Sequence, residues 1–223
     1  MKTTQAQNMI LGQVYTNEVT DQRILDALAS VPRELFVPAA LKGAAYVDED
    51  IAIGEGRFLM EPLVLARLVQ LAAITEESRV LVIGALNGYA AAIVAKLAQH
   101  VVAIEQSETM LEEARKQLAA LGITNVDLQQ VKSLADGFTP LAPYDAIIVA
   151  GAGSIISDNL AMQLALHGKL VAVRNLSINP AGVQGLGKGV LVTRVGAQLE
   201  YHEHFDAATA LLPGFENKAG FTF

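Results

Sequence analysis

The sequence of 223 residues contains no cysteine. Disulfide bonds, thiolate metal ligands and cysteine nucleophiles are therefore excluded. The sequence also has no apolar run that approaches the ~18 residues needed to cross a membrane. Its N-terminal stretch, MKTTQAQNMILGQV, lacks the sustained apolar segment and the small-residue cleavage site of a signal peptide. From these absences we expect a soluble cytoplasmic protein with no membrane span.

Positive charge is scarce as well. The chain has 16 Lys and Arg residues against 23 Asp and Glu residues, which gives a net charge of -7 at pH 7. Because nucleic-acid binding requires a basic face that neutralises phosphates, we expect no nucleic-acid partner. Hydrophobic residues, in contrast, make up 52% of the chain. This content predicts either a sheet buried on both faces or an apolar surface hidden in a homo-oligomer.

The first sixty residues predict helices and loops. Asp21 is placed to cap the helix DQRILDALASV, and DEDIAIGEGRFLMEP predicts a loop that contains Gly54 and Gly56. Pro62 suits the first turn of the largely buried helix PLVLARLVQLAAI. We therefore predict an N-terminal helical addition of residues 1–61 and an α/β domain of residues 62–223, packed as one compact unit.

From Arg79 onward, predicted strands and helices alternate. The strands are RVLVIG, VVAIEQ, VDLQQV, YDAIIVA and GKLVAVRN, and the helices between them are YAAAIVAKLAQ, SETMLEEARKQLAALG and SDNLAMQLAL. Continuous apolar strands that alternate with helices indicate a mostly parallel sheet covered on both faces. Ser107 and Gly122 suit the two caps of the second helix. The final segments GVLVTRV and QLEYHEHF predict an antiparallel hairpin at the edge of the sheet.

The stretch GALNGY, residues 84–89, predicts a glycine turn between a strand and a helix. Parallel sheets bind ligands at the carboxyl ends of their strands, where such a turn leads into a helix N-terminus. Glu105 ends the next strand, 21 residues after Gly84, and a carboxylate at this spacing can accept hydrogen bonds from both ribose hydroxyls of an adenosine. The alternative is that Glu105 is a solvated strand end in an ordinary tight turn. Because only Gly84 and Gly88 are present, the G-x-G-x-x-G pattern is absent and a dinucleotide is disfavoured.

Several segments together resemble the protein-L-isoaspartate O-methyltransferase family: DQRILDALASVPRELFVP, IAIGEGRFLMEP, RVLVIGALNGYAAAIVAKLAQHVVAIE, YDAIIVAGA and HGKLVAV. The resemblance implies a Rossmann-like methyltransferase fold with a seven-stranded sheet. It further implies that S-adenosyl-L-methionine (SAM) lies over the turn from Gly84 to Gly88, with Glu105 on its ribose. The acceptor would be an isoaspartyl carboxylate of a damaged protein or peptide, held by the GEGRFLMEP loop.

Several positions depart from the family pattern. Family members usually have an acidic residue at the position of Val82, a glycine at Leu86 and, at Ser133, an aspartate that contacts the adenine. Their acceptor loop carries a threonine and a serine at the positions of Phe58 and Met60. These replacements predict that SAM binding is weakened or lost. The alternative to carboxyl methyl transfer is therefore a non-catalytic family member that uses the fold as a binding or interaction module.

The candidate catalytic positions are Arg57 and Met60, the latter a loop position without the usual hydroxyl. Arg57 either recognises a carboxylate or faces water. The predicted cofactor-binding residues are Gly84, Leu86, Gly88, Glu105 and Ser133.

Two further segments have alternative interpretations. The apolar run FLM, residues 58–60, either packs under the domain or contributes to a self-association or partner interface. Glu200, His202 and His204 alternate along one predicted strand face, where they either bind zinc or form a polar outer surface. We predict that no metal is bound.

Overall fold

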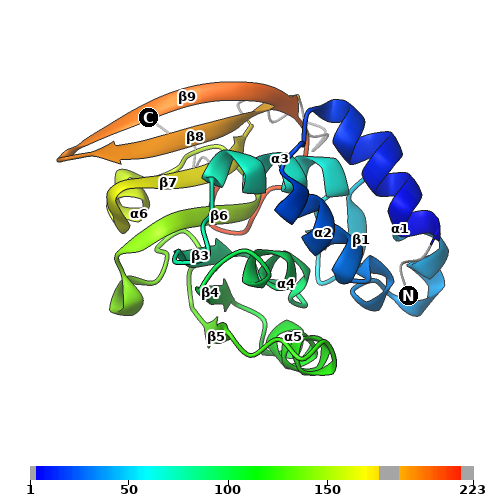
Figure 1. The fold of residues 1–223 in the computed structure, drawn as a ribbon. Coiled ribbons are helices and arrows are strands. Elements are labelled where there is room, and N and C mark those ends of the chain that lie inside the picture. Colours follow the sequence, from blue (N-terminus) through cyan, green and yellow to red (C-terminus); the bar gives the residue numbers. More distant parts are fainter. Residues whose placement is uncertain (1–3, 176–185, 217–223) are drawn as a thin grey trace, which may run out of the picture.

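The computed structural model describes residues 4–175 and 186–216 (Figure 1). In these ranges seven strands form one sheet in the order β5-β4-β3-β6-β7-β8-β9. Strands β3 to β7 are parallel, whereas β8 runs antiparallel to β7 and β9 antiparallel to β8. The predicted mostly parallel sheet with an antiparallel C-terminal hairpin is confirmed. The strand bounds are β3 Arg79–Ile83, β4 His100–Glu105, β5 Val126–Gln130, β6 Tyr144–Gly153, β7 Leu164–Arg174, β8 Gly187–Val195 and β9 Gln198–Ala207.

The central strands are buried on both faces, which explains why their sequences show no polar alternation. Successive side chains of β3 point to opposite faces. Val80 and Val82 belong to a hydrophobic cluster that includes residues of α3 and α4. Leu81 and Ile83 belong to a second cluster, which includes Leu160 of α6. The helix bounds are α3 Pro62–Ala72, α4 Tyr89–Ala95, α5 Glu108–Ala120 and α6 Asp158–Ala161.

The predicted helix boundaries are explained by local capping. Asp21 precedes α2 (Gln22–Ser30), and its side chain accepts a hydrogen bond from the backbone N–H of Arg23. Ser107 caps α5 in the same way, by accepting from Met110. Each cap satisfies a backbone donor that has no partner within its helix. Pro62 occupies the first turn of α3, where its missing N–H costs no hydrogen bond.

Two predicted elements were wrong. The loop expected around Gly54 and Gly56 is an antiparallel hairpin of β1 (Ile51–Gly54) and β2 (Arg57–Leu59). Its turn is tight because both glycines and Glu55 have positive φ. The helix expected over SDNLAMQLAL is only the four residues of α6, because Leu164 already belongs to β7 and pairs with Tyr144 of β6. Short apolar runs do not distinguish a buried helix from a buried strand.

The N-terminal part packs against the α/β sheet unit and shares its core. Helix α1 (Thr4–Met9) continues into a π-helical turn η1 (Ile10–Val14) and a 3-10 turn η2 (Tyr15–Asn17), with two further 3-10 turns, η3 (Arg33–Leu35) and η4 (Ala39–Ala44). Helix α2 and the turn η1, blue in Figure 1, contact α3, and α1 contacts α2. One hydrophobic cluster includes buried residues from Ala6 to Ala207 and therefore crosses the predicted boundary at residue 61. Within the described ranges, no helix has the length and apolar character required for a membrane span.

Candidate functional site

The turn between β3 and α4 depends on an unusual backbone. Gly84, Leu86 and Gly88 all have positive φ, with values of 79°, 51° and 98°. Gly84 donates its N–H to Ile104 at 3.1 Å, which fixes the turn against β4. A Cβ on Gly88 would lie only 3.1 Å from that of Ala114, so the glycine permits close packing of α4 on α5. Leu86 adopts a conformation that a leucine rarely takes, and its side chain is buried in the core.

Glu105 lies at the carboxyl end of β4 and is completely buried. Its Oε1 accepts a hydrogen bond from the backbone of Gln106 at 2.7 Å, and its Oε2 accepts one from the backbone of Leu86 at 3.0 Å. Arg57, from β2, makes a bidentate ion pair with the same carboxylate, with Nη1–Oε1 at 2.6 Å and Nη2–Oε2 at 3.0 Å. Arg57 therefore binds a carboxylate and does not face water, and this carboxylate belongs to the chain itself.

Comparison with known proteins identifies the family of this chain. The family model described as protein-L-isoaspartate(D-aspartate) O-methyltransferase matches residues 4–185. The chain belongs to this family. It is 41% identical over 178 residues to the protein-L-isoaspartate O-methyltransferase of Methylorubrum extorquens (strain PA1), a match that covers 80% of this chain and 75% of the relative. The corresponding protein of Methanoculleus marisnigri is 37% identical over 190 residues, which cover 85% and 83% of the two chains.

Solved structures of other isoaspartate methyltransferases share the fold. One protein-L-isoaspartate O-methyltransferase superposes with a TM-score of 0.79 at 21% identity, over 95% of this chain and 67% of that one. A second, described as a putative protein-L-isoaspartate O-methyltransferase from Plasmodium falciparum in complex with S-adenosyl-L-homocysteine, gives 0.73 at 18% identity, over 95% and 97%. These likenesses confirm the predicted Rossmann-like methyltransferase fold.

Two hollows lie near the predicted site residues: a small cavity inside the glycine turn, and an open depression lined by Arg57 and Glu105. A cavity of about 10 Å³ lies between the turn residues Gly84 and Leu86, Tyr89 of α4, and Met60. This volume holds about one water molecule. The interior of the turn is therefore filled by side chains. Of the predicted cofactor residues, Gly84 and Leu86 line this cavity, whereas Glu105 lines a separate depression of about 280 Å³.

The acceptor loop is mainly packed inward. Leu59 and Met60 are buried, and only Phe58 of the FLM run is exposed, at 39%. The run therefore packs under the domain and is not a continuous surface patch, while self-association stays a prediction. Ser133 lies beyond β5 and is half-buried. The backbone carbonyl of its neighbour Lys132 accepts a hydrogen bond from the side-chain amide of Gln106 at 2.7 Å. This contact places residues 132 and 133 beside the end of β4.

Arg33 was not predicted as a site residue, although it lies in the family-specific segment VPRELFVP. Its guanidinium is completely buried and donates from Nε to the carbonyl of Ala45 and from Nη2 to that of Met60, both at 2.7 Å. Its Cζ atom lies 4.8 Å from the ring centroid of Tyr89. Arg33 therefore fixes the end of the acceptor loop against α4. The available sequence signal was its place in VPRELFVP, the segment most specific to the family that the sequence resembles.

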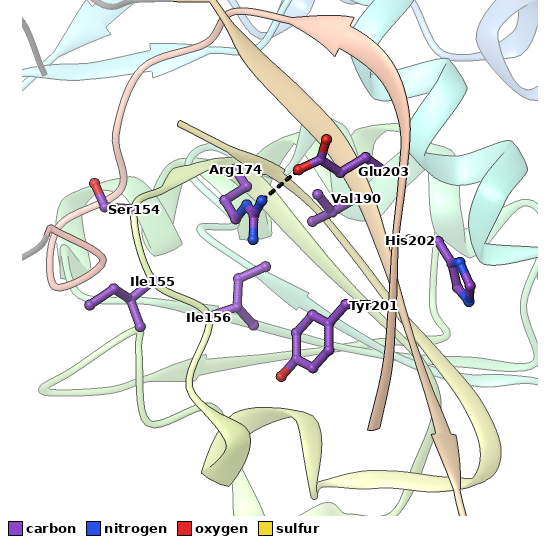
Figure 2. A pocket seen from close by; sticks show the side chains of 8 residues that line it. All are labelled: Ser154, Ile155, Ile156, Arg174, Val190, Tyr201, His202 and Glu203. Atoms are coloured by element: carbon purple, nitrogen blue, oxygen red, sulfur yellow. Dashed lines mark hydrogen bonds and ion pairs between the residues drawn. The ribbon is translucent and has the colours of Figure 1, made fainter. Parts of the chain in front are cut away.

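A larger cavity, of about 470 Å³, lies at the other half of the sheet (Figure 2). Arg174 of β7 points into it and pairs with Glu203 of β9. Tyr201 donates a hydrogen bond to Asp158 at 2.8 Å. These polar groups are thus engaged with one another. The lining residues are Ser154, Ile155, Ile156, Arg174, Val190, Tyr201, His202 and Glu203.

The zinc alternative finds no support from the geometry. Glu200, His202 and His204 lie exposed along β9. Across residues 4–175 and 186–216, no group of three or more histidine, aspartate or glutamate side chains is arranged to hold a metal ion.

Glu61, which precedes α3, is expected to make stability depend on pH. Burial, reinforced by the carboxylates of Asp48 and Asp50, raises its pKa from 4.5 to about 7, and Arg33 opposes the shift. The folded state therefore keeps a proton that the unfolded chain releases between about pH 4.5 and 7, so stability falls as the pH rises through this window. E61Q is expected to be about 1–2 kcal/mol more stable than the wild type at pH 8, after allowance for partial exposure.

This prediction is checked by urea unfolding of E61Q at pH 4 and pH 8. At pH 4 the wild-type carboxyl is protonated in both states, so the variant should differ from it by less than about 0.5 kcal/mol. Glu55→Gln, in the exposed turn of the β1–β2 hairpin that precedes Glu61, is the matched control and should show no pH-dependent gain. An equal effect of E61Q at both pH values would contradict the assignment.

Proposed function

We propose that this chain catalyses SAM-dependent methyl transfer to the carboxylate of isoaspartyl residues in damaged proteins or peptides. One observation carries the proposal: a family match over residues 4–185 coincides with a buried glutamate at the end of β4, facing the glycine turn of β3. A relative that is named for this activity is 41% identical to the chain.

The residues of the chain suit the demands of this reaction. When bound, the donor supplies a methyl group on a sulfonium. An acceptor carboxylate is already ionised near neutral pH, so no general base is required. The chain has to hold the two reactants in line and exclude water. The buried side chains of Leu86, Tyr89 and Met60 make the vicinity of the glycine turn apolar. Glu105 would hold the donor ribose once Arg57 has moved away.

The proposal predicts selective methylation. With isotopically labelled SAM, the protein is expected to form a base-labile methyl ester on an isoaspartyl peptide and not on the aspartyl peptide of the same sequence. Glu105→Gln should lower kcat/KM at least about tenfold, because hydrogen bonds to a charged acceptor are worth about 1.5–3 kcal/mol. Glu108→Gln, an exposed neighbour that pairs with Arg115 on the surface, is the matched control and should keep the activity.

Methyl-ester formation in neither peptide, with millimolar SAM present, would contradict the proposed function. That result would instead favour the non-catalytic binding module.

A further inference from the structure

We propose that the chain closes its own donor site: Arg57 occupies the carboxylate that would hold the donor ribose, and Leu212 covers the glycine turn. The inference rests on the proposed function, since it concerns the regulation of that same site. Arg57, Glu105 and Leu212 come from three segments that are far apart in the sequence but meet at the carboxyl ends of β3, β4 and β6.

The first part of the closure is a saturated carboxylate. An ionised glutamate offers about four lone-pair positions. The backbone N–H groups of Gln106 and Leu86 take two of them, and the two Arg57 nitrogens take the other two, all at 2.6–3.0 Å. The N–H of Ser107 makes a fifth, longer contact to Oε1 at 3.5 Å. No good acceptor position remains for a ribose hydroxyl. A nucleoside can therefore gain this glutamate only if the Arg57 pair opens.

The second part is the segment that follows β9, residues 208–216, which we call the closing segment. It returns to β6, where Leu212 donates its N–H to Ala152 at 2.9 Å. A Cβ on Gly84 would lie 2.8 Å from Leu212 Cδ2 and 3.4 Å from Arg57 Nη2. A Cβ on Gly151 would lie 2.5 Å from Leu212 Cγ. Leu212 thus packs directly between the ends of β3 and β6, beside Arg57.

A single carboxylate anchors the closing segment. Asp50 Oδ2 accepts from the hydroxyl of Thr209 at 2.7 Å and from the N–H of Ala210 at 2.8 Å, while its Oδ1 accepts from the N–H of Glu61 at 2.9 Å. The anchor therefore joins the segment to both ends of the β1–β2 hairpin that carries Arg57. Because both closing groups depend on the same hairpin, movement of this hairpin would release them together.

The closed site still has an outer entrance. A depression of about 280 Å³ lies over the ion pair, lined by Glu55, Arg57, Glu105, Gln106, Ser107 and Pro213. Arg57 is 7% exposed there, whereas Glu105 is fully buried. A ligand that arrives through this depression meets Arg57 before it meets the glutamate, which makes Arg57 the group to be displaced.

The test is calorimetric binding of S-adenosyl-L-homocysteine to the full chain and to three variants. Arg57→Met removes both guanidinium donors at similar length and is expected to raise the affinity at least tenfold. Leu212→Ala opens the cover and should raise it several-fold. Thr209→Val removes one anchor of the closing segment with little change in shape and should act in the same direction. Binding serves as the readout, so the result does not depend on turnover.

Two matched controls distinguish an effect on the closed donor site from a general loss of protein stability. Arg115→Met breaks an exposed Arg–Glu pair on α5, and Leu164→Ala removes a fully buried leucine at the opposite end of β6 and β7. Neither should change the affinity by more than twofold. If Arg57→Met proves too unstable to study, the Leu212 and Thr209 variants decide the question.

The possible outcomes distinguish this inference from the proposed function. If the wild type binds as tightly as all three variants, closure is refuted, and methylation of the isoaspartyl peptide can still stand. If the variants gain affinity but none methylates the peptide, closure holds and the proposed function fails. If no form binds the ligand at millimolar concentration, both are refuted.

Discussion

Replacement of Arg57 by methionine is expected to lower the free energy of unfolding by about 3–5 kcal/mol, because it leaves a fully buried carboxylate without its cation. Glu105 is 0% exposed, and its three remaining donors are the backbone N–H groups of Leu86, Gln106 and, at 3.5 Å, Ser107. Urea unfolding at pH 7 measures the loss. The same pair that opposes the donor would thus stabilise the ligand-free protein. A stability–function conflict of this kind is common at binding sites, where strong internal contacts compete with the ligand.

A double-mutant cycle makes this first prediction specific. Arg57→Met combined with Glu105→Gln should cost less than the sum of the two single changes, because neither charge is then left buried alone. Arg115→Met is the control for an exposed pair and should cost less than about 1 kcal/mol. Saturating S-adenosyl-L-homocysteine should partly restore the stability of Arg57→Met, by about 2.7 kcal/mol at one hundred times its Kd. Unfolding of Arg57→Met at the wild-type urea concentration would contradict the prediction.

Replacement of Arg33 by methionine is expected to be comparably severe, at about 2–5 kcal/mol. The change leaves the carbonyls of Ala45 and Met60 without their donors, and each unsatisfied buried group costs about 1–3 kcal/mol. It also removes the cation from the face of Tyr89. Because Met60 lies in the segment that the resemblance assigns to the acceptor, the variant should also lose the proposed isoaspartyl methylation beyond what its folded fraction explains. Denaturant unfolding and initial rates measure the two effects.

Lysine at the same position separates charge from geometry. Arg33→Lys keeps the positive charge, but an ammonium on a flexible stem does not reproduce the planar fork that reaches two carbonyls. We expect an intermediate loss of stability. Arg23→Met changes an arginine that is half-exposed on α2 and should cost less than about 1 kcal/mol. Equal stabilities for Arg33→Met and Arg23→Met would contradict the proposed role of Arg33.

The features that could be predicted from the sequence are those encoded within short segments. Buried strands are continuous apolar runs, and the caps at Asp21 and Ser107 depend on residues two or three positions away. Glu105 could be found because its spacing from Gly84 reflects one strand–helix–strand unit. The hairpin at residues 51–59 was missed because its two glycines suit an open loop as well as a tight turn.

Sequence alone determined the mostly parallel sheet and the position of the glycine turn and its glutamate, because these follow from local periodicity and spacing. The family came from the resemblance of whole segments. Only the tertiary structure decided how Arg57 and Leu212 are used. Arg57 lies 48 residues from Glu105 in the sequence, and Leu212 reaches the turn from beyond the last strand. No local pattern encodes such partners, since long-range ion pairs and packing contacts arise from the way the sheet brings distant strand ends together.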